Sequence, residues 1–367
     1  MVDKIGKKLG FGCMRLKMTD DNKVDYGEFS RMIDAFIAAG FNYFDTAHGY
    51  IDGQSETAIR DCLVARYDRE DFVLADKLSC WYFEKEEDIL PLFEHQLSQC
   101  GVEYFDFYLF HSVTRDYYEK FKRCNAFAII KKQKEQGRIR HIAMSFHDTA
   151  EVLDRILTEQ PFIEAVQLQF NYLDYDDLNV QSKACYDVAV KHGKKVLVME
   201  PVRGGYLANL PDRAAAVFDR FGTGKSHASY ALRFAASFPE VFMVLSGMGS
   251  TDMMQDNINT FSAFVPLNED EFHAVERARA IIREVRQIPC TGCGYCTEVC
   301  PQNIPIPQLF SVYNQVLAAK ITRGEAKDRF PKDAGFASDC VKCGACEKVC
   351  PQNIEIRKQL ETIAKIR

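Results

Sequence analysis

The stretch Phe41-Asn42-Tyr43-Phe44-Asp45-Thr46-Ala47-His48-Gly49-Tyr50 joins an aromatic, strand-like run to a polar loop directly behind it. The run ends in an acid, Asp45, and a tyrosine, Tyr50, follows on the loop. Binding and catalytic residues are often carried on loops that a rigid scaffold positions. The stretch is therefore typical of a catalytic edge, and we expect the residues around it to form the scaffold.

Eight short β-type runs, this one included, recur along the first part of the chain and alternate with segments of helical period. In one such segment Phe29, Met32 and Phe36 fall on a single helix face. The alternation predicts a (β/α)₈ barrel over residues 1–285. An open doubly wound sheet is the alternative, but that fold normally carries a G-x-G-x-x-G turn after an early strand, and the sequence has none there. The runs are 9–13, 41–44, 72–75, 104–110, 139–144, 163–168, 195–199 and 241–245.

Four polar residues follow successive runs and so fall at one rim of the predicted barrel. Asp45 and Tyr50 follow the second run, Lys77 the third and His111 the fourth. Barrel enzymes hold their chemistry at the C-terminal ends of the strands. A cation near a tyrosine lowers its pKa and lets it exchange a proton near neutral pH. We expect Asp45 to hold Lys77, and His111 to orient a substrate oxygen beside Tyr50.

This pattern resembles the signature of the aldo-keto reductase family over about residues 5–265. The matching positions are Asp45-Thr46-Ala47, Tyr50, Gly53, Ser55-Glu56, Lys77 and His111. The resemblance implies a (β/α)₈ barrel and hydride transfer between nicotinamide and a carbonyl or alcohol substrate. Tyr50 would then be the general acid in reduction and the base in oxidation.

The resemblance also implies a set of cofactor-binding residues. Ser145 and Gln167 match positions that hold the nicotinamide carboxamide, and Met199 stands where the family usually has an aromatic ring. Ser246, Gly247, Asp256 and Asn257 match the pyrophosphate and adenine region. The sequence departs from the family at Phe146, where an asparagine is usual, and at Gly247 and Met253, where basic residues often bind a 2′-phosphate.

Arg203 is a candidate to replace the missing basic residues, and Gly204 beside it is expected in a loop that contacts the cofactor. The expected cofactor is NADPH or NADH. A flavin is the alternative, since the phosphate site after strands seven and eight of a barrel can also hold a flavin phosphate.

The C-terminal part carries the pattern C-x₂-C-x₂-C-x₃-C-P twice. This is the ligand spacing of a two-cluster [4Fe–4S] ferredoxin, in which the fourth cysteine of each run serves the other cluster. A zinc site normally uses two separated pairs of ligands instead. Residues 286–367 are therefore predicted to form a small, mostly helical domain with two clusters. One set is Cys290, Cys293, Cys296 and Cys350, and the other is Cys340, Cys343, Cys346 and Cys300.

The composition of the chain indicates which kinds of partner and which cellular environment to expect. The net charge of −6 gives no reason to expect nucleic-acid binding. No apolar run reaches the roughly 18 residues that a membrane span needs, so no membrane association is expected. Clustered cysteines indicate metal sites in a cytoplasmic protein rather than disulfides. Residues 286–367 carry 12 basic and 8 acidic residues, and this excess is compatible with docking of an acidic ferredoxin or flavodoxin.

The sequence thus predicts an iron–sulfur oxidoreductase of the aldo-keto reductase type. Nicotinamide moves two electrons as a hydride, whereas each cluster moves one, so coupling the two would need a converter such as a flavin. The alternative is an electron-transfer protein whose barrel binds another cofactor or no longer performs carbonyl chemistry.

Overall fold

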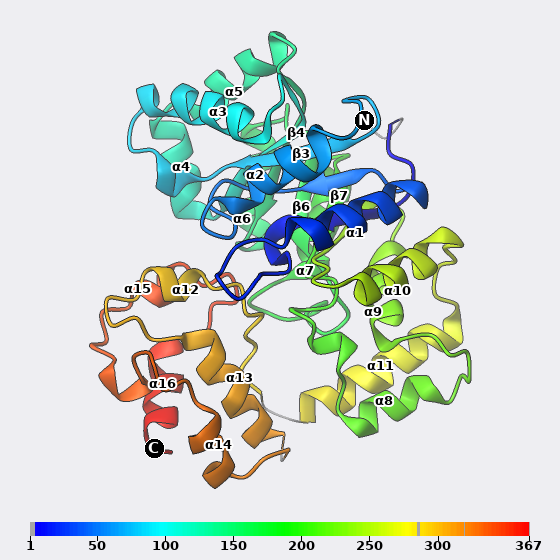
Figure 1. Cartoon of the computed structure of the whole chain (residues 1–367), viewed down its shortest axis with the longest axis vertical. Helices are drawn as coiled ribbons and strands as arrows, with labels where there is room; N and C mark the ends of the chain where they lie inside the picture. The colour runs from blue at the N-terminus through cyan, green and yellow to red at the C-terminus, as the bar shows by residue number, and fades with distance from the viewer. Residues whose placement is uncertain (1–3, 285–286, 319, 367) are drawn as a thin grey trace. The chain divides into compact units, whose positions relative to one another are not determined.

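The computed structural model describes residues 4–284, 287–318 and 320–366 (Figure 1). Eight parallel strands form a closed barrel in sequence order, as predicted. Each strand overlaps its predicted run and begins within about two residues of it. The strands are β1 (Leu9–Gly12), β2 (Tyr43–Asp45), β3 (Val73–Leu78), β4 (Phe105–Val113), β5 (Ile139–Phe146), β6 (Ala165–Gln169), β7 (Lys195–Met199) and β8 (Val241–Ser246).

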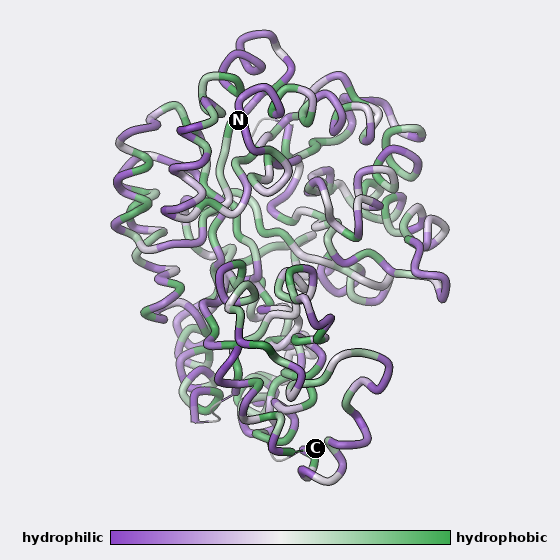
Figure 2. The backbone as a smooth tube through the Cα atoms, turned by 90° about the vertical axis from the view of Figure 1, so that its left-hand side faces the viewer, coloured by the Kyte–Doolittle hydropathy of each residue, from purple (hydrophilic) through white to green (hydrophobic). Residues whose placement is uncertain are grey.

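Helices follow the strands. Along these helices hydrophobic and hydrophilic residues alternate, as the colours of the tube in Figure 2 show. Helix α1 shows the local cause of such elements: Asp25 accepts a hydrogen bond from the Glu28 amide at its start, and Gly40 lies just past its end with a φ of +82°. The helices to the end of the barrel are α1 (Tyr26–Ala38), α2 (Gln54–Ile59), α3 (Glu86–Cys100), α4 (Arg115–Arg123), α5 (Ala126–Glu135), α6 (Ala150–Glu159), α7 (Ser182–Lys191), α8 (Asp212–Asp219), α9 (His227–Ala236), α10 (Thr251–Ser262) and α11 (Glu269–Glu284).

The barrel interior is filled by side chains that alternate along the strands. Tyr43, Ala75, Leu109, Ala143 and Ala165 belong to one buried cluster inside the barrel. Successive residues of a strand point to opposite faces, so the residues two positions further along also point inward. This periodicity determines which polar side chains reach the C-terminal end of the barrel interior.

The chain divides into two compact units. The first comprises residues 1–201 and 229–267, and the second comprises 202–228 and 268–367. The predicted domain boundary, between 285 and 286, lies outside the described residues. Within the second unit α8 and α11 pack against each other. Its remaining helices are α12 (Tyr295–Glu298), α13 (Ile306–Leu317), α14 (Arg323–Arg329), α15 (Ala345–Lys348) and α16 (Ile356–Ala364), shown together in Figure 1.

Helix α14 lies in a highly charged stretch of the chain, residues 320–335. Thr322 accepts a hydrogen bond from the Glu325 amide, and the Glu325 carboxylate accepts one from the Thr322 amide at 2.7 Å. This reciprocal cap stabilises the first turn of the helix.

Among the described residues, no helix is both long and apolar enough to cross a membrane.

Candidate active site and cysteine pockets

The barrel strands bring polar side chains together two residues beyond their core positions. Asp45 follows Tyr43 in β2, Lys77 follows Ala75 in β3, and His111 follows Leu109 in β4. Ser145 and Gln167 stand in the same relation to Ala143 and Ala165 in β5 and β6. All five polar residues are buried. One geometric rule therefore places residues that are far apart in the sequence at the same end of the barrel.

Lys77 and Asp45 form a buried ion pair at the centre of this group. The Lys77 Nζ donates to Asp45 Oδ1 at 2.6 Å and to the Thr46 carbonyl oxygen at 2.6 Å. The same Nζ lies 4.8 Å from the centroid of the Tyr50 ring. Burial raises the pKa of Asp45, while the Lys77 charge acts in the opposite direction. A cation next to a tyrosine favours its phenolate form, so the arrangement suits proton exchange at Tyr50.

His111 lies beside Tyr50, with ring centroids 5.9 Å apart and the rings nearly perpendicular. Burial, and then the positive charge of Lys77, hold the pKa of His111 well below its usual value, so the imidazole is neutral. Its Nδ1 is 2.6 Å from the Ser79 hydroxyl, and Ser79 is fully buried. Either atom can donate in this contact, and a Ser79 donor places the imidazole proton on Nε2. Trp81 packs against His111 with ring centroids 5.1 Å apart.

Behind Lys77, on the outer face of β3, lies a pair of buried carboxyl groups that the sequence interpretation missed. Oxygen atoms of Glu56 and Asp76 and the sulfur of Cys100 all lie within 4.8 Å of one another. Burial raises the pKa of Glu56 to about 7, and burial together with the Glu56 charge raises the pKa of Asp76 well above its usual value. The pair therefore holds a proton. Asp76 Oδ1 accepts from the Lys77 amide at 2.7 Å, and His48 Nδ1 lies 2.9 Å from Glu56 Oε2.

Two of the predicted nicotinamide-binding residues lie side by side, since Ser145 pairs with Gln167 between β5 and β6. The Ser145 hydroxyl also lies 3.9 Å from the Met199 sulfur. Gln167 is buried, and within the described part of the chain its Oε1 atom has no hydrogen-bond partner. A buried acceptor without a partner is costly unless a ligand satisfies it. A carboxamide NH₂ group would satisfy it, so these residues fit a nicotinamide.

The residues predicted for the pyrophosphate and adenine region lie at the end of β8 and in α10. The Asn257 side chain donates to the Ser246 hydroxyl at 2.9 Å, and both are buried. Gly247 follows in the turn after β8, where an added Cβ would lie 3.5 Å from the Arg15 side chain. Asp256 precedes Asn257 in α10. Arg15 is thus a basic residue beside this turn, and its position in the N-terminal segment gave no sequence signal.

The loop after β7 has an unusual backbone. Glu200, Arg203, Gly204 and Gly205 all have positive φ values, between +50° and +89°. Glu200 forms an ion pair with Arg15 at 3.2 Å. Arg203 and Gly204 belong to the second unit. A Cβ on Gly204 would lie 2.3 Å from the Thr291 carbonyl oxygen, so the loop passes tightly against the first cysteine motif. Only glycine permits this approach.

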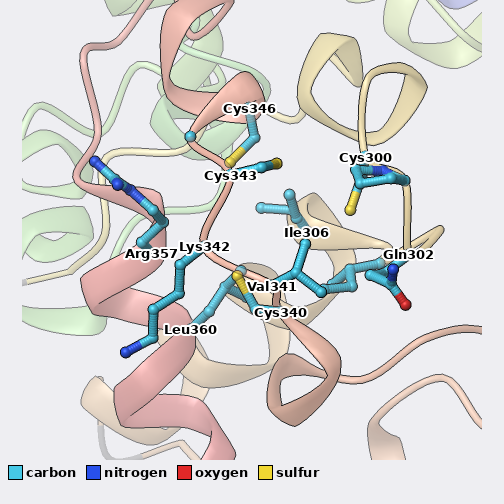
Figure 3. A pocket seen from close by; sticks show the side chains of 13 residues that line it. Cys300, Gln302, Ile306, Cys340, Val341, Lys342, Cys343, Cys346, Arg357 and Leu360 are labelled. Carbon is cyan, nitrogen blue, oxygen red and sulfur yellow. The ribbon is translucent and has the colours of Figure 1, made fainter.

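The structure brings the eight C-terminal cysteines around two pockets. One is lined by Cys290, Cys293, Cys296 and Cys350, and the other by Cys300, Cys340, Cys343 and Cys346. Figure 3 shows the sulfur atoms of the second set around one space. Each pocket takes its fourth cysteine from the opposite motif, which is the grouping expected for a two-cluster ferredoxin. Four sulfur atoms from two segments fit a [4Fe–4S] cluster in each pocket.

Comparison with known families agrees with both parts of the chain. The aldo/keto reductase family model matches residues 8–280. The chain belongs to the aldo/keto reductase family. A second model, for a 4Fe-4S dicluster domain, matches residues 289–355. The predicted combination of an aldo/keto reductase barrel with a C-terminal cluster domain is thus confirmed.

Individual relatives are distant. The chain is 22% identical to the uncharacterised oxidoreductase YqkF of Bacillus subtilis, over 73% of this chain and 91% of the relative. It is 38% identical to norsolorinic acid reductase B of Dothistroma septosporum, but the match spans only 19% of each protein. An aldo-keto reductase of Mycobacterium is 34% identical over 31% of this chain and 40% of the relative.

Solved aldo-keto reductases share the barrel. A holo-form enzyme of Bacillus halodurans has a TM-score of 0.62 and 23% identity, over 74% of this chain and 91% of that one. An enzyme of Klebsiella pneumoniae in complex with NADPH has a TM-score of 0.60 and 18% identity, over 74% and 90%. At these identities the likeness establishes the fold alone.

Proposed function

We propose that this protein interconverts a carbonyl and an alcohol by hydride transfer, with Tyr50 as the proton donor in reduction and the acceptor in oxidation. The observation that carries the proposal is the Lys77–Asp45 ion pair, whose ammonium lies 4.8 Å from the Tyr50 ring centre. Asp45 holds the ammonium in place, and the ammonium stabilises negative charge on Tyr50. Neutral His111 donates from Nε2 to the substrate oxygen and so orients the carbonyl next to the tyrosine hydroxyl.

A nicotinamide cofactor would supply or accept the hydride. Gln167 and Ser145 would hold its carboxamide, and Met199 would pack against its ring. Ser246, Gly247, Asp256 and Asn257 would hold the pyrophosphate and adenine, with Arg203 and Gly204 on the loop after β7. The Klebsiella enzyme that shares the barrel is solved with NADPH. NADPH and NADH are both candidates for this chain, because Gly247 and Met253 stand where the family often has basic residues that bind the 2′-phosphate.

The decisive test of the barrel chemistry is Tyr50→Phe. Removal of the hydroxyl is expected to lower carbonyl reduction by at least ~100-fold, because a positioned general acid commonly contributes that much. Cluster absorbance and nucleotide binding should stay unchanged. Turnover equal to that of the parent protein would remove Tyr50 from this role.

We further propose that the eight cysteines bind two [4Fe–4S] clusters that exchange single electrons with an acidic ferredoxin or flavodoxin, and that electron exchange with the nicotinamide site in the barrel requires a two-to-one electron converter such as a flavin. The proposed ligand sets are testable by pairing substitutions and measuring iron. Cys293→Ser with Cys350→Ser should remove one cluster and leave half of the iron, whereas Cys343→Ser with Cys350→Ser should remove both. The reverse result would mean that each motif binds its own cluster.

A second candidate function is an electron-transfer protein whose barrel binds a flavin. The observation that favours it is the pair of cysteine pockets, because clusters move single electrons and a flavin can pass them on one at a time. An absorption spectrum of anaerobically purified protein distinguishes the two candidates. Flavin bands would favour the second, whereas bleaching of the iron–sulfur band by NADH or NADPH without flavin bands would contradict it.

A further inference from the structure

The two cysteine motifs repeat at an interval of 50 residues, so each residue near one pocket has a counterpart near the other. Most counterparts are equal or similar, such as Phe310 and Leu360. Two are not. Lys342 lines the second pocket where the first motif has Gly292, and Arg357 lines it where the first pocket has Pro307. The pockets therefore differ in charge although their sulfur ligands match.

The difference extends beyond these two positions. Residues 340–361 contain four basic and three acidic residues, whereas the matching residues 290–311 contain one acidic residue and no basic one. The second cluster pocket is thus surrounded by a more positive segment of chain.

Lys342 also has a strained backbone. Its φ is +58°, and its counterpart Gly292 has a φ of +71°. A lysine in the left-handed region is uncommon, whereas glycine adopts it freely. Strained residues persist mainly where the surrounding structure requires them, and they cluster at functional sites. At this position lysine thus costs more backbone free energy than glycine would, and it places a charged side chain at the lining of the pocket.

Arg357 lies directly against the cluster-binding loop. An added Cβ at Gly344 would be 3.7 Å from the Arg357 Cζ atom, so the guanidinium packs on the turn between Cys343 and Cys346 (Figure 3). Arg357 is paired with Glu347 at 2.7 Å and Lys342 with Glu361 at 2.6 Å. Neither of these glutamates is among the residues that line the pocket. Arg357 and Lys342 are thus the members of these two ion pairs that line the pocket.

Two residues of the second cysteine motif are also more exposed to water than their counterparts in the first motif. Cys343 is exposed, whereas its counterpart Cys293 is only partly so. Val341 is 58% exposed, and its counterpart Thr291 is 5% exposed, with the Gly204 loop packed against its carbonyl oxygen. Two residues of the second motif, Val341 and Cys343, are therefore more exposed to water than their counterparts in the first motif.

We infer that Arg357 and Lys342 make the cluster of Cys300, Cys340, Cys343 and Cys346 the more easily reduced of the two. The inference rests on the proposed binding of the clusters. Reduction adds one negative charge, which nearby cations and water stabilise. In a protein that carries both clusters and one added electron, that electron would therefore reside mainly on the second cluster. Ile306 lines both pockets, so the two sites share this side chain.

A redox titration of the intact protein, followed by electron paramagnetic resonance, tests the inference. The parent protein should show two distinct potentials. In the double variant Lys342→Gly, Arg357→Gln the higher potential should fall toward the lower one. The equilibrium constant for electron exchange between the clusters should drop at least tenfold, which corresponds to about 59 mV for one electron. The signal that moves should be the one that Cys343→Ser removes.

Two control variants separate charge from disturbance of the fold. Lys358→Gln removes a neighbouring charge that does not line the pocket and should leave both potentials unchanged. Arg357→Lys keeps the charge and should retain most of the separation. Equal potentials in the parent protein, or unchanged potentials in the double variant, would overturn the inference while the clusters themselves remain. Absence of iron in the purified protein would instead overturn the proposed cluster binding.

Discussion

Lys77 and Asp76 are neighbours in β3, yet their side chains enter two different electrostatic environments. The Lys77 ammonium points into the barrel and pairs with Asp45, whereas the Asp76 carboxyl group points outward to Glu56 and Cys100. The peptide between them joins the two, since Asp76 Oδ1 accepts from the Lys77 amide. The carboxyl pair is therefore linked through one backbone hydrogen bond to the lysine that faces Tyr50.

The carboxyl pair predicts a pH dependence of stability. Because burial raises the pKa of Glu56 from about 4.5 to about 7, the folded state binds more protons than the unfolded state between these values. Stability contributed by this proton is fully present below about pH 4.5 and is lost as the pH rises through about 7. Glu56→Gln cannot ionise and keeps an amide donor toward Asp76. The stability of the parent relative to this variant should fall by up to ~3 kcal/mol between pH 5 and 8, as measured by urea unfolding. A constant difference across this range would contradict the proton assignment.

The buried ion pair predicts a rescue of stability without a rescue of activity. Lys77→Met leaves the Asp45 carboxylate buried without its partner and should destabilise the fold by ~3–5 kcal/mol at pH 7. Adding Asp45→Leu removes the unpaired charge and should recover much of that loss. Carbonyl reduction should stay low in both variants, because neither has a cation beside Tyr50. Recovery of activity in the double variant would show that the pair serves stability alone.

The Ser79–His111 contact predicts that the Ser79 hydroxyl, in addition to that of Tyr50, supports catalysis. Ser79→Ala removes the donor to Nδ1, so the imidazole loses its fixed tautomer and kcat should fall by ~10-fold or more with little change in nucleotide affinity. Ser79→Thr keeps the hydroxyl and serves as the matched control. If alanine and threonine variants reduced substrate equally well, the Ser79 hydroxyl would have no positioning role.

The loop after β7 predicts a difference between two adjacent glycines. Gly204 and Gly205 both have positive φ values, so alanine at either position should cost ~1–2 kcal/mol from the backbone alone. At Gly204 the added Cβ also meets the Thr291 carbonyl oxygen, whereas a Cβ added at Gly205 would have no atom beyond its chain neighbours within 4 Å. Gly204→Ala should therefore destabilise the protein more than Gly205→Ala and accelerate iron loss. Equal effects in thermal unfolding and iron release would contradict this close packing.

Much of this architecture follows from periodicity. Lys77, His111 and Ser145 follow strand runs, so the alternation of side chains along a strand is enough to place them at one rim of the barrel. The spacing of the cysteines likewise gives the grouping seen around the pockets. What periodicity describes is how a residue is oriented within its own element.

The features that the sequence did not predict depend on contacts with residues of another helix or strand. Asp76 reads as one polar position in a strand until α2 brings Glu56 and α3 brings Cys100 against it. Strand β4 continues to Val113, beyond the predicted end at Phe110, through a bulge in which Ser112 has a φ of +52°. Helix α14 was hidden by its high charge, although Thr322 and Glu325 are a recognisable capping pair.

The exchange of fourth cysteines between the motifs has a consequence for how such a domain can be divided. Cys350 lies with the first motif and Cys300 with the second, so neither half carries a complete set of four sulfur atoms. A fragment that ended before residue 340 would retain four cysteines of correct spacing and still lack the geometry of either pocket. One motif alone therefore cannot form either pocket, whether it is expressed by itself or moved into another protein. Both copies must be translated before either metal centre can be completed.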